Sequence, residues 1–175
     1  NVGANALLMN LQSQSFLLKA SADNKSVDII AKTPMHGVKI NNQLSLTKGA
    51  CGDFRDKIKV SVSTQQSAKG EKIIDFKGGF ASNCQEKMLH LSLFDANTQT
   101  EILWRALWLE INGQEVNRQE SNGKTAQAFA KIIEGFVPPN AYLLATHQSK
   151  PLPEVIRLLN KFSNNVMARQ TFLSL

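Results

Sequence analysis

Ser163 and Asn165 are the residues of this sequence whose types and spacing point most directly to chemistry. They lie two positions apart in a tight connection between two segments of helical periodicity. A hydroxyl and a carboxamide projected together can relay a proton and hold a substrate amide. The simpler interpretation is that Ser163 caps the second helix, because a serine oxygen can accept a hydrogen bond from an unpaired N–H there. On the tripeptide alone capping is the better explanation, so the surrounding sequence has to decide.

The helices on either side of this connection carry clear sequence signals. Pro151 and Pro153 stand at the start of the first helix and Glu154 lies in its first turn, where proline and acidic residues are favoured. This helix is predicted to stop at Phe162-Ser163, and a further helix is predicted from Asn165. Because no terminating signal follows, we expect the chain to end within that helix, as a fragment of a longer protein would.

Helical periodicity also governs the sequence from residue 95 onwards. A helix is predicted over about residues 98–111, since apolar residues recur there at three- and four-residue spacing. Asn112-Gly113 is expected to end it. A shorter helix is expected next, up to Pro138-Pro139, and Tyr142–His147 is a strand candidate. The two tryptophans are better explained as core residues than as a ligand platform. The two apolar stripes are Leu103, Trp104, Leu107, Trp108 and Ile111, then Ala126, Phe129, Ala130 and Ile133.

Residues 5–94 show a different pattern, in which apolar and polar residues alternate in short runs. Glycine and proline fall between the runs and mark turns. Alternation implies one buried and one solvated face, as in an antiparallel sheet. This half is therefore predicted to be a compact β domain, with its clearest strands at 27–30, 38–40, 58–62 and 88–93.

Composition excludes several classes of protein. The 175 residues are 42% hydrophobic with a formal charge of +6, which is typical of a globular chain with a real core. No apolar run approaches the roughly 18 residues of a membrane span. The basic residues are dispersed and are not interleaved with aromatics, so nucleic acid is not an expected partner. A mildly basic face could instead serve an anionic envelope polymer. The first residue is Asn1 and no signal peptide is recognisable, which suggests a mature protein or a fragment.

Cys51 and Cys84 are the only cysteines, and the residues alone allow two interpretations. As a disulfide they would close a loop of 33 steps (84 minus 51), which stabilises a fold by roughly 3–4 kcal/mol and suits an oxidising compartment. The alternative is two unrelated buried thiols. A zinc site is disfavoured because no histidine has ligand spacing to the cysteines. No metal and no cofactor are therefore expected.

The segment His147–Ala168 resembles the serine D-alanyl-D-alanine carboxypeptidases known as class C penicillin-binding proteins. It reads His-Gln-Ser-Lys-Pro-Leu and then a helix ending Asn-Lys-Phe-Ser-Asn-Asn-Val-Met-Ala, and in that family a Ser-x-Pro-Leu helix leads directly into a Ser-x-Asn motif. A weaker resemblance covers nearly the whole chain. Asn5–Asn10 looks like a strand of the family's inserted domains, residues 51–54 and 79–84 look like its two cysteine segments, and the helix of Trp104 takes the place of its long helix.

The resemblance implies an active site built from three motifs. A Ser-x-x-Lys supplies the nucleophile and its base, Ser-x-Asn the proton relay and a substrate contact, and Lys-Thr-Gly a clamp for the terminal carboxylate. Only Ser163, as proton relay, and Asn165, as contact to the substrate amide, carry over to this sequence. The implied reaction is attack on the penultimate D-Ala carbonyl of a peptidoglycan stem peptide ending in D-Ala-D-Ala, through an acyl-serine intermediate. β-Lactams would acylate the same serine.

Two segments match the missing motifs by letter but not by context. Ser45-Leu46-Thr47-Lys48 reads as Ser-x-x-Lys, but the nucleophile motif needs a helix start, whereas Ser45 ends a strand pattern followed by glycines. Lys124-Thr125-Ala126 lacks the final glycine of the clamp and precedes Ser-x-Asn. We therefore expect the nucleophile and its lysine to lie outside this chain, and the chain alone to be inactive.

The resemblance also implies the architecture and the compartment. We expect an α+β fold, with residues 1–95 forming part of a β-rich inserted domain and residues 96–175 forming part of the helical lobe of a transpeptidase-like domain that carries Ser-x-Asn. The implied location is the periplasm or cell envelope. Two alternatives stay open: a non-catalytic envelope module that binds peptidoglycan or protein, and a serine β-lactamase, which the β-rich region disfavours. Endopeptidase action on peptide cross-links is a further possible activity of the first candidate.

Overall fold

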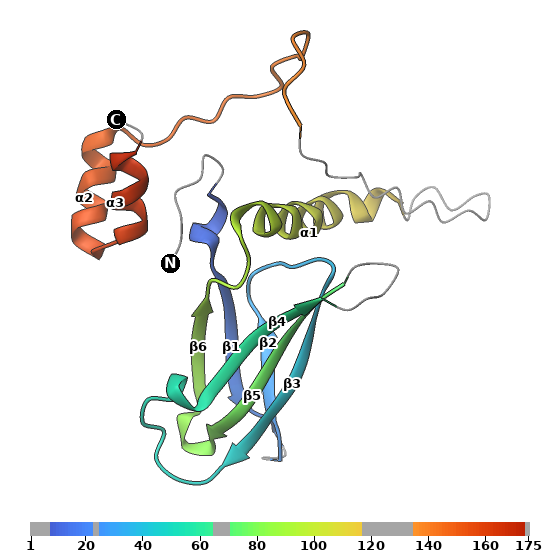
Figure 1. Cartoon of the computed structure of the whole chain (residues 1–175), viewed down its shortest axis with the longest axis vertical. Coiled ribbons are helices and arrows are strands. Elements are labelled where there is room, and N and C mark those ends of the chain that lie inside the picture. Colours follow the sequence, from blue (N-terminus) through green and yellow to red (C-terminus); the bar gives the residue numbers. More distant parts are fainter. Residues whose placement is uncertain (1–7, 23–24, 65–70, 117–134, 174–175) are drawn as a thin grey trace, which may run out of the picture.

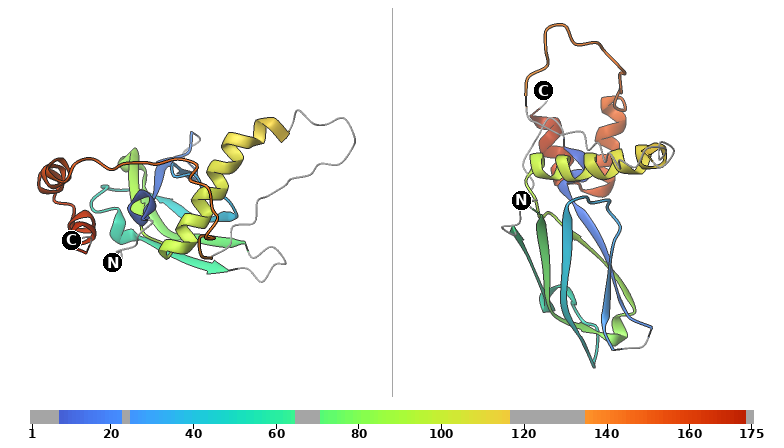
Figure 2. Two further views of the ribbon diagram at one scale, coloured as in Figure 1. Left: turned by 90° about the horizontal axis from the view of Figure 1, so that it is seen from above. Right: turned by 90° about the vertical axis from the view of Figure 1, so that its right-hand side faces the viewer.

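The computed structural model of the protein describes residues 8–22, 25–64, 71–116 and 135–173. These residues form an α+β fold, in which two three-stranded sheets are followed in the chain by helices (Figures 1 and 2). The predicted fold class is confirmed. The strands are β1 (Gln14–Ala20), β2 (Val27–Ala31), β3 (Val38–Thr47), β4 (Ile58–Thr64), β5 (Lys72–Ala81) and β6 (Glu86–Leu91).

The two sheets differ in how their strands run. The first has the order β2-β1-β6 and is antiparallel throughout. The second has the order β3-β5-β4, in which β5 is antiparallel to β4 but parallel to β3. The prediction of an antiparallel sheet is therefore wrong for the β3-β5 pair. Alternation along a strand reports which face is buried, and it carries no information on the direction of the neighbouring strand.

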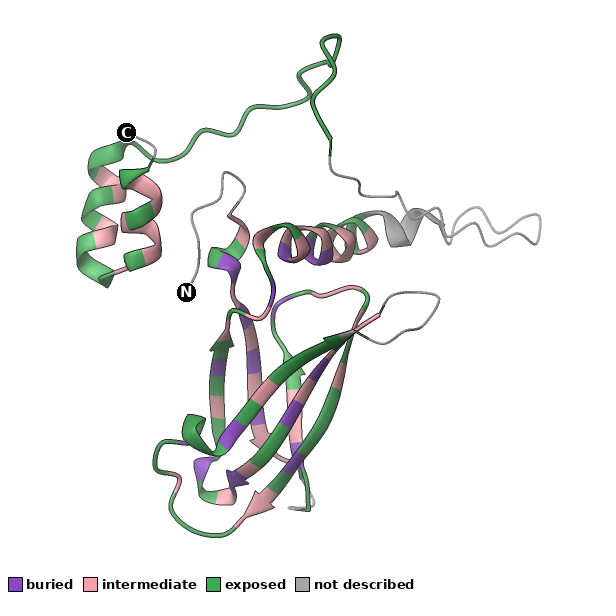
Figure 3. Ribbon diagram, in the orientation of Figure 1, coloured by how far each residue is buried: buried purple, intermediate pink, exposed green. Residues whose placement is uncertain are grey.

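Aromatic rings fill the space between the two sheets, where the buried positions of the facing strands gather (Figure 3). Phe16 of β1 and Phe76 of β5 are fully buried and meet edge to face, with ring centroids 5.1 Å apart. Phe54 and Phe80 form a second such pair at 6.3 Å. Burial of each large apolar side chain contributes about 1.5–3 kcal/mol. Burial of these apolar side chains is the main contribution that holds the two sheets together.

A disulfide joins Cys51 to Cys84, with the Cα atoms 4.8 Å apart. The predicted pairing is confirmed, and the alternative of two separate thiols is wrong. The parallel strands β3 and β5 explain why the two cysteines meet. Thr47 lies opposite Ala81, so both strands end at the same edge of the sheet and the segments that follow them start side by side.

Helix α1 (Ala96–Val116) begins directly after Asp95. The Asp95 carboxylate accepts a hydrogen bond of 3.0 Å from the backbone N–H of Thr98, as an N-terminal cap does. This bond to Thr98 holds the pKa of Asp95 below its ordinary value. The helix continues through Asn112-Gly113, so the predicted end there is wrong: glycine inside a helix costs only about 1 kcal/mol relative to alanine, and the flanking residues can outweigh it.

The buried side of α1 also differs from the prediction. Ile102 and Leu103 are buried, and Ile102 belongs to the core cluster of the sheets. Trp104 and Trp108, by contrast, are 47% and 48% exposed. The prediction that both tryptophans are core residues is therefore wrong for the residues that the structure describes. A helical period predicts which residues share a face, but several faces of α1 are apolar, and only packing decides which one is covered.

Helices α2 (Leu152–Phe162) and α3 (Asn165–Phe172) form a helical hairpin near the C-terminus (Figure 1). The predicted start and end of α2 are confirmed, whereas α3 ends at Phe172 and the chain does not stop within it. Residues 135–151 contain no helix or strand, so the strand prediction for Tyr142–His147 is wrong. A strand needs a neighbour to pair its backbone, and none of the described strands pairs with this segment.

Two further predictions concern segments at the limits of the described residues. Of the strand expected at Asn5–Asn10, the first three residues lie outside the described residues. Met9 and Asn10 belong instead to the short turn η1 (Met9–Gln12), so that part of the prediction is wrong. The helix expected around Ala126–Ile133 lies outside the described residues altogether.

Candidate active site

The Ser163-Asn164-Asn165 tripeptide forms the connection between α2 and α3, and each of its residues has a different structural position. Ser163 ends α2 with φ 48° and ψ 46°, in the left-handed region that favours glycine. The N–H of Asn164 donates to the Leu159 carbonyl at 3.3 Å, which closes the end of α2 as in a Schellman motif. Asn165 is the first residue of α3.

Asn164, the middle residue, is the cap of α3. Its Oδ1 accepts a hydrogen bond of 3.0 Å from the backbone N–H of Met167. The simpler interpretation of Ser163 as the cap of α3 is therefore wrong. Sequence reasoning missed Asn164, although asparagine is as good an N-terminal cap as serine and the N–H three residues on is the usual donor.

The side chains of Ser163 and Asn165 remain exposed at this connection. Neither side chain makes a hydrogen bond to the residues that the structure describes. The capping bond of α3 is made by Asn164 instead. One turn of backbone thus presents a hydroxyl and a carboxamide with donor and acceptor capacity to spare. Such a pair can hold a substrate amide and pass a proton, which is the chemistry suggested by the sequence.

The structure also bears on the two segments that resemble the missing motifs. Ser45 lies within strand β3, and its hydroxyl donates to the Gly78 carbonyl at 3.1 Å. A strand cannot place Lys48 one helical turn beyond Ser45, so this segment is not a nucleophile motif. The Lys124-Thr125-Ala126 segment lies outside the described residues.

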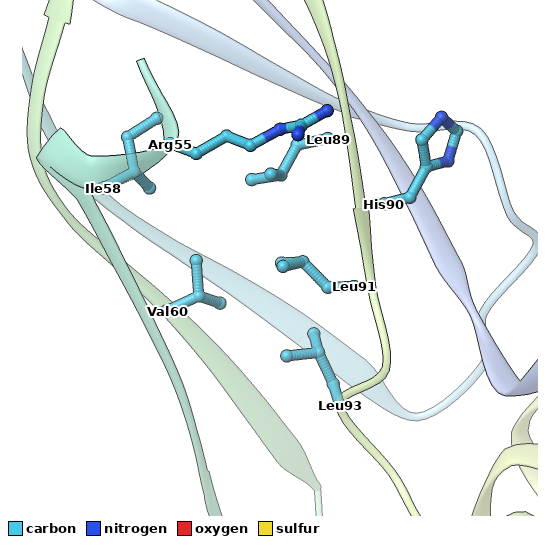
Figure 4. Close-up of a pocket in the computed structure, with 7 residues that line it drawn as sticks. All are labelled: Arg55, Ile58, Val60, Leu89, His90, Leu91 and Leu93. Carbon is cyan, nitrogen blue, oxygen red and sulfur yellow. The ribbon is translucent and has the colours of Figure 1, made fainter. Parts of the chain in front are cut away.

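A hollow between strands β4 and β6 is lined in part by a histidine and an arginine (Figure 4). Its walls are mostly aliphatic, and His90 points away from the other lining side chains (Figure 4). The Nδ1 of His90 lies 2.8 Å from the Ser15 hydroxyl at an exposed position. Nothing buries this pair, and no described carboxylate orients the ring. The lining residues are Arg55, Ile58, Val60, Leu89, His90, Leu91 and Leu93.

The described residues offer neither a metal site nor a membrane-spanning helix. In the described part of the chain, no three His, Cys, Asp or Glu side chains come together where they could hold a metal ion. None of the described helices has the length and apolar character needed to span a bilayer. The Ser163-Asn165 connection is therefore the strongest candidate site in the described residues.

Comparisons with known proteins identify the family and the fold of the chain. The sequence model of the D-Ala-D-Ala carboxypeptidase 3 (S13) family matches residues 9–175. Penicillin-binding protein 4 of Haemophilus influenzae, solved in complex with a β-lactam, superposes with a TM-score of 0.58 at 17% identity, over 98% of this chain and 35% of that chain. The likeness shows a shared fold, and the chain spans about a third of the length of that protein. No curated protein matches the chain.

Proposed function

Because the chain belongs to the D-Ala-D-Ala carboxypeptidase 3 (S13) family, we propose that it forms part of a penicillin-binding carboxypeptidase that cleaves peptidoglycan stem peptides ending in D-Ala-D-Ala. The observation that carries the proposal is the Ser163-x-Asn165 connection, whose hydroxyl and carboxamide are exposed while Asn164 alone caps the helix. The disulfide supports an oxidising compartment, and we place the protein in the periplasm or cell envelope.

In the proposed reaction a serine outside these residues attacks the penultimate D-Ala carbonyl. A C–O bond forms, the C–N bond to the terminal D-Ala breaks, and an acyl-serine intermediate results. Ser163 relays the proton from the nucleophile side to the departing amine, and the Asn165 carboxamide holds a substrate amide. Water then hydrolyses the acyl-serine. β-Lactams would acylate the same nucleophile, and endopeptidase cleavage of cross-links would follow the same steps.

The test is the labelling rate with a fluorescent penicillin, measured on the complete protein encoded by the gene that contains this sequence. Replacing Ser163→Ala or Asn165→Ala should slow acylation by at least about a hundredfold, since a positioned proton-transfer group contributes that much or more. Asn160→Ala, an exposed asparagine on the same hairpin, is the matched control and should label at the normal rate.

Two outcomes would count against the proposal. Unchanged labelling of both site variants would remove the site assignment. Absence of any labelling in the complete protein would leave the non-catalytic binding module as the better explanation. The 175-residue chain alone should not be labelled, because the nucleophile and the Lys-Thr-Gly clamp are expected outside it.

A further inference from the structure

The outward face of the β3-β5-β4 sheet is mostly polar, and two of its lysines, Lys59 and Lys77, oppose each other near one end. Phe76 and Ile74 of β5 point into the core, so the alternate residues of β5 and of its neighbours point outward. The register of the sheet fixes which residues share this outward face. They are Lys39, Asn41, Gln43, Ser45 and Thr47 from β3, Ile73, Asp75, Lys77 and Gly79 from β5, and Lys59, Ser61 and Ser63 from β4, with Lys57 directly before β4.

Two lysines lie directly opposite each other on this face. Lys59 of β4 pairs in register with Lys77 of β5, and both side chains are exposed. Like charges at directly opposed positions destabilise a sheet. Lys57, also exposed, directly precedes β4. None of the three lysines forms an ion pair with any residue that the structure describes.

Negative charges near this face come from Asp75 and Glu71, and Asp56 directly precedes Lys57 in the chain. Asp75 accepts hydrogen bonds from the Asn41 carboxamide at 2.6 Å and from the Ser63 hydroxyl at 3.1 Å. Asp75 keeps its negative charge in these bonds, because both donors are neutral. Glu71 forms an ion pair with Lys39 at 2.6 Å. Lys39 lies opposite Ile73 near the start of β3, whereas Lys57 lies next to Ile58, at the other end of the sheet. Lys57, Lys59 and Lys77 form no ion pair within the described residues and outnumber Asp56 and Asp75, so this end of the sheet carries a net positive charge that would attract an anionic partner.

The shape and composition of the face narrow the kind of partner. Ser45, Ser61 and Gly79 are small residues and give the face low relief. It has no aromatic or arginine anchors of the kind that dominate protein interfaces, and no aromatic platform for stacking nucleic-acid bases. Ile73 is the single large apolar side chain among the described residues of this face, which is too little for insertion into a lipid surface. These features suit an extended polymer that carries carboxylates and hydroxyls.

We propose that this face, centred on Lys57, Lys59 and Lys77, is a docking site for peptidoglycan, and that it holds the free carboxylates of the peptide side chains away from the site of cleavage. The choice of peptidoglycan rests on the proposed function, since an enzyme that trims stem peptides works on an insoluble polymer that carries such carboxylates repeatedly. Several weak charge contacts on one strand of polymer then act together and keep the protein on its substrate.

The test is co-sedimentation of the full 175-residue chain with purified insoluble peptidoglycan. The double variant Lys59→Gln/Lys77→Gln should bind about tenfold more weakly than the unaltered chain, and binding should fall steeply as salt rises from about 50 mM to about 200 mM. The matched control, Lys25→Gln/Lys32→Gln, removes two exposed lysines that flank β2 in the other sheet. It should stay within about twofold of the unaltered chain.

Further arms identify the partner. Peptidoglycan whose carboxylates have been amidated should lose binding to the unaltered chain. Urea unfolding of the Lys59→Gln/Lys77→Gln variant should be unchanged or shifted to higher urea, because a repulsive pair is removed. Equal loss in both double variants, or undiminished binding to amidated peptidoglycan, would overturn the proposal. Binding to phosphatidylglycerol vesicles or to duplex DNA as strong as to peptidoglycan would overturn the choice of partner.

These results are independent of the proposed activity. Penicillin labelling of the complete protein does not require the polymer, so Lys59→Gln/Lys77→Gln should label at the normal rate. If neither the unaltered protein nor its variants are labelled, while sedimentation with peptidoglycan still depends on Lys59 and Lys77, the enzyme is rejected and the docking site is retained. If labelling is normal but the Lys59→Gln/Lys77→Gln variant sediments with peptidoglycan as well as the unaltered chain does, the enzyme is retained and the docking site is rejected.

Discussion

Ser163 occupies a backbone conformation that serine adopts at a cost. The left-handed region is unfavourable by about 1–2 kcal/mol for residues other than glycine. Glycine is the usual residue at this position after a helix. Asn164 caps α3, so helix stability does not require a serine at this position, which is consistent with the proposed role of its hydroxyl in proton relay.

This gives a prediction that separates chemistry from structure at Ser163. Ser163→Gly should leave the free energy of unfolding of the complete protein unchanged or raise it by up to about 1 kcal/mol, because it relieves the left-handed conformation. Ser163→Ala keeps that conformation and should change the free energy by less than about 0.5 kcal/mol. Both variants lack the hydroxyl, so both should be acylated slowly by penicillin.

The measurements are urea unfolding and the rate of penicillin labelling on the same preparations. A Ser163→Gly variant that is stable and labels normally would show that the hydroxyl is dispensable. A variant that is slow only because it is destabilised would show a structural role instead.

At the scale of elements, the disulfide strengthens β3-β5, one of the two strand pairs whose partners are not consecutive in the chain; the other is β1-β6. β3 and β5 are parallel neighbours with β4 between them in the chain, so their pairing closes a long loop. The Cys51–Cys84 bond fastens the segments that leave both strands at one edge. It therefore offsets part of the conformational entropy that is lost when this loop closes.

Removal of this bond should destabilise the β region without abolishing its core. Cys51→Ser/Cys84→Ser should lower the free energy of unfolding by roughly 3–4 kcal/mol for a loop of 33 residues. Urea unfolding followed by circular dichroism measures the change, and adding reductant to the unaltered chain should reproduce it. Thiol counting on the unreduced, denatured chain should find no free thiol; two free thiols would contradict the bond.

At the scale of the whole molecule, buried glutamines join the strands to α1. The Gln14 side chain, fully buried in β1, donates to the side-chain oxygen of Gln99 in α1 and accepts from the backbone N–H of Leu93 at 3.1 Å. Gln12 donates to the Phe94 carbonyl at 2.5 Å. Buried side-chain amides that hydrogen-bond each other favour one arrangement of the elements that carry them. Removing one amide leaves its partner unpaired and lowers the free energy of unfolding. We infer that they fix the direction in which α1 leaves the sheets.

The tryptophans provide a way to test this junction, because the only two in the chain, Trp104 and Trp108, both lie in α1. In the unaltered chain, unfolding monitored by tryptophan fluorescence should coincide with unfolding monitored by circular dichroism of the strands. Gln99→Leu removes the acceptor of the Gln14 side-chain NH2 group and should lower the free energy of unfolding by about 1–3 kcal/mol. The fluorescence change should then occur at lower urea than the change in circular dichroism.

The companion measurements complete a double-mutant cycle with Gln14→Leu. A coupling of at least about 0.5 kcal/mol is expected for groups in direct contact. Asn97→Ala, an exposed position in the first turn of α1, is the control and should leave the two transitions coincident. Additive effects of the Gln14 and Gln99 substitutions would mean that the two amides do not act together.

The sequence by itself determined the parts of this protein that depend on local chemistry. The start of α2 follows from Pro151, Pro153 and Glu154, and the strand character of residues 58–62 from strict alternation, because caps and alternation act within a few residues. The Ser-x-Asn pattern was equally local. The division of the chain at residues 95 and 96 stays a prediction, although Ile102 of α1 packs in the core of the strands.

Only the tertiary structure decided matters that depend on distant neighbours. The parallel pairing of β3 with β5, the exposure of Trp104 and the absence of a strand at Tyr142–His147 each depend on which surfaces meet, and no local pattern encodes that. The same holds for Lys59 and Lys77, which are 18 residues apart in sequence (77 minus 59) and opposed in the sheet. Strand register, set by packing of the core face, is what turned dispersed lysines into one charged surface.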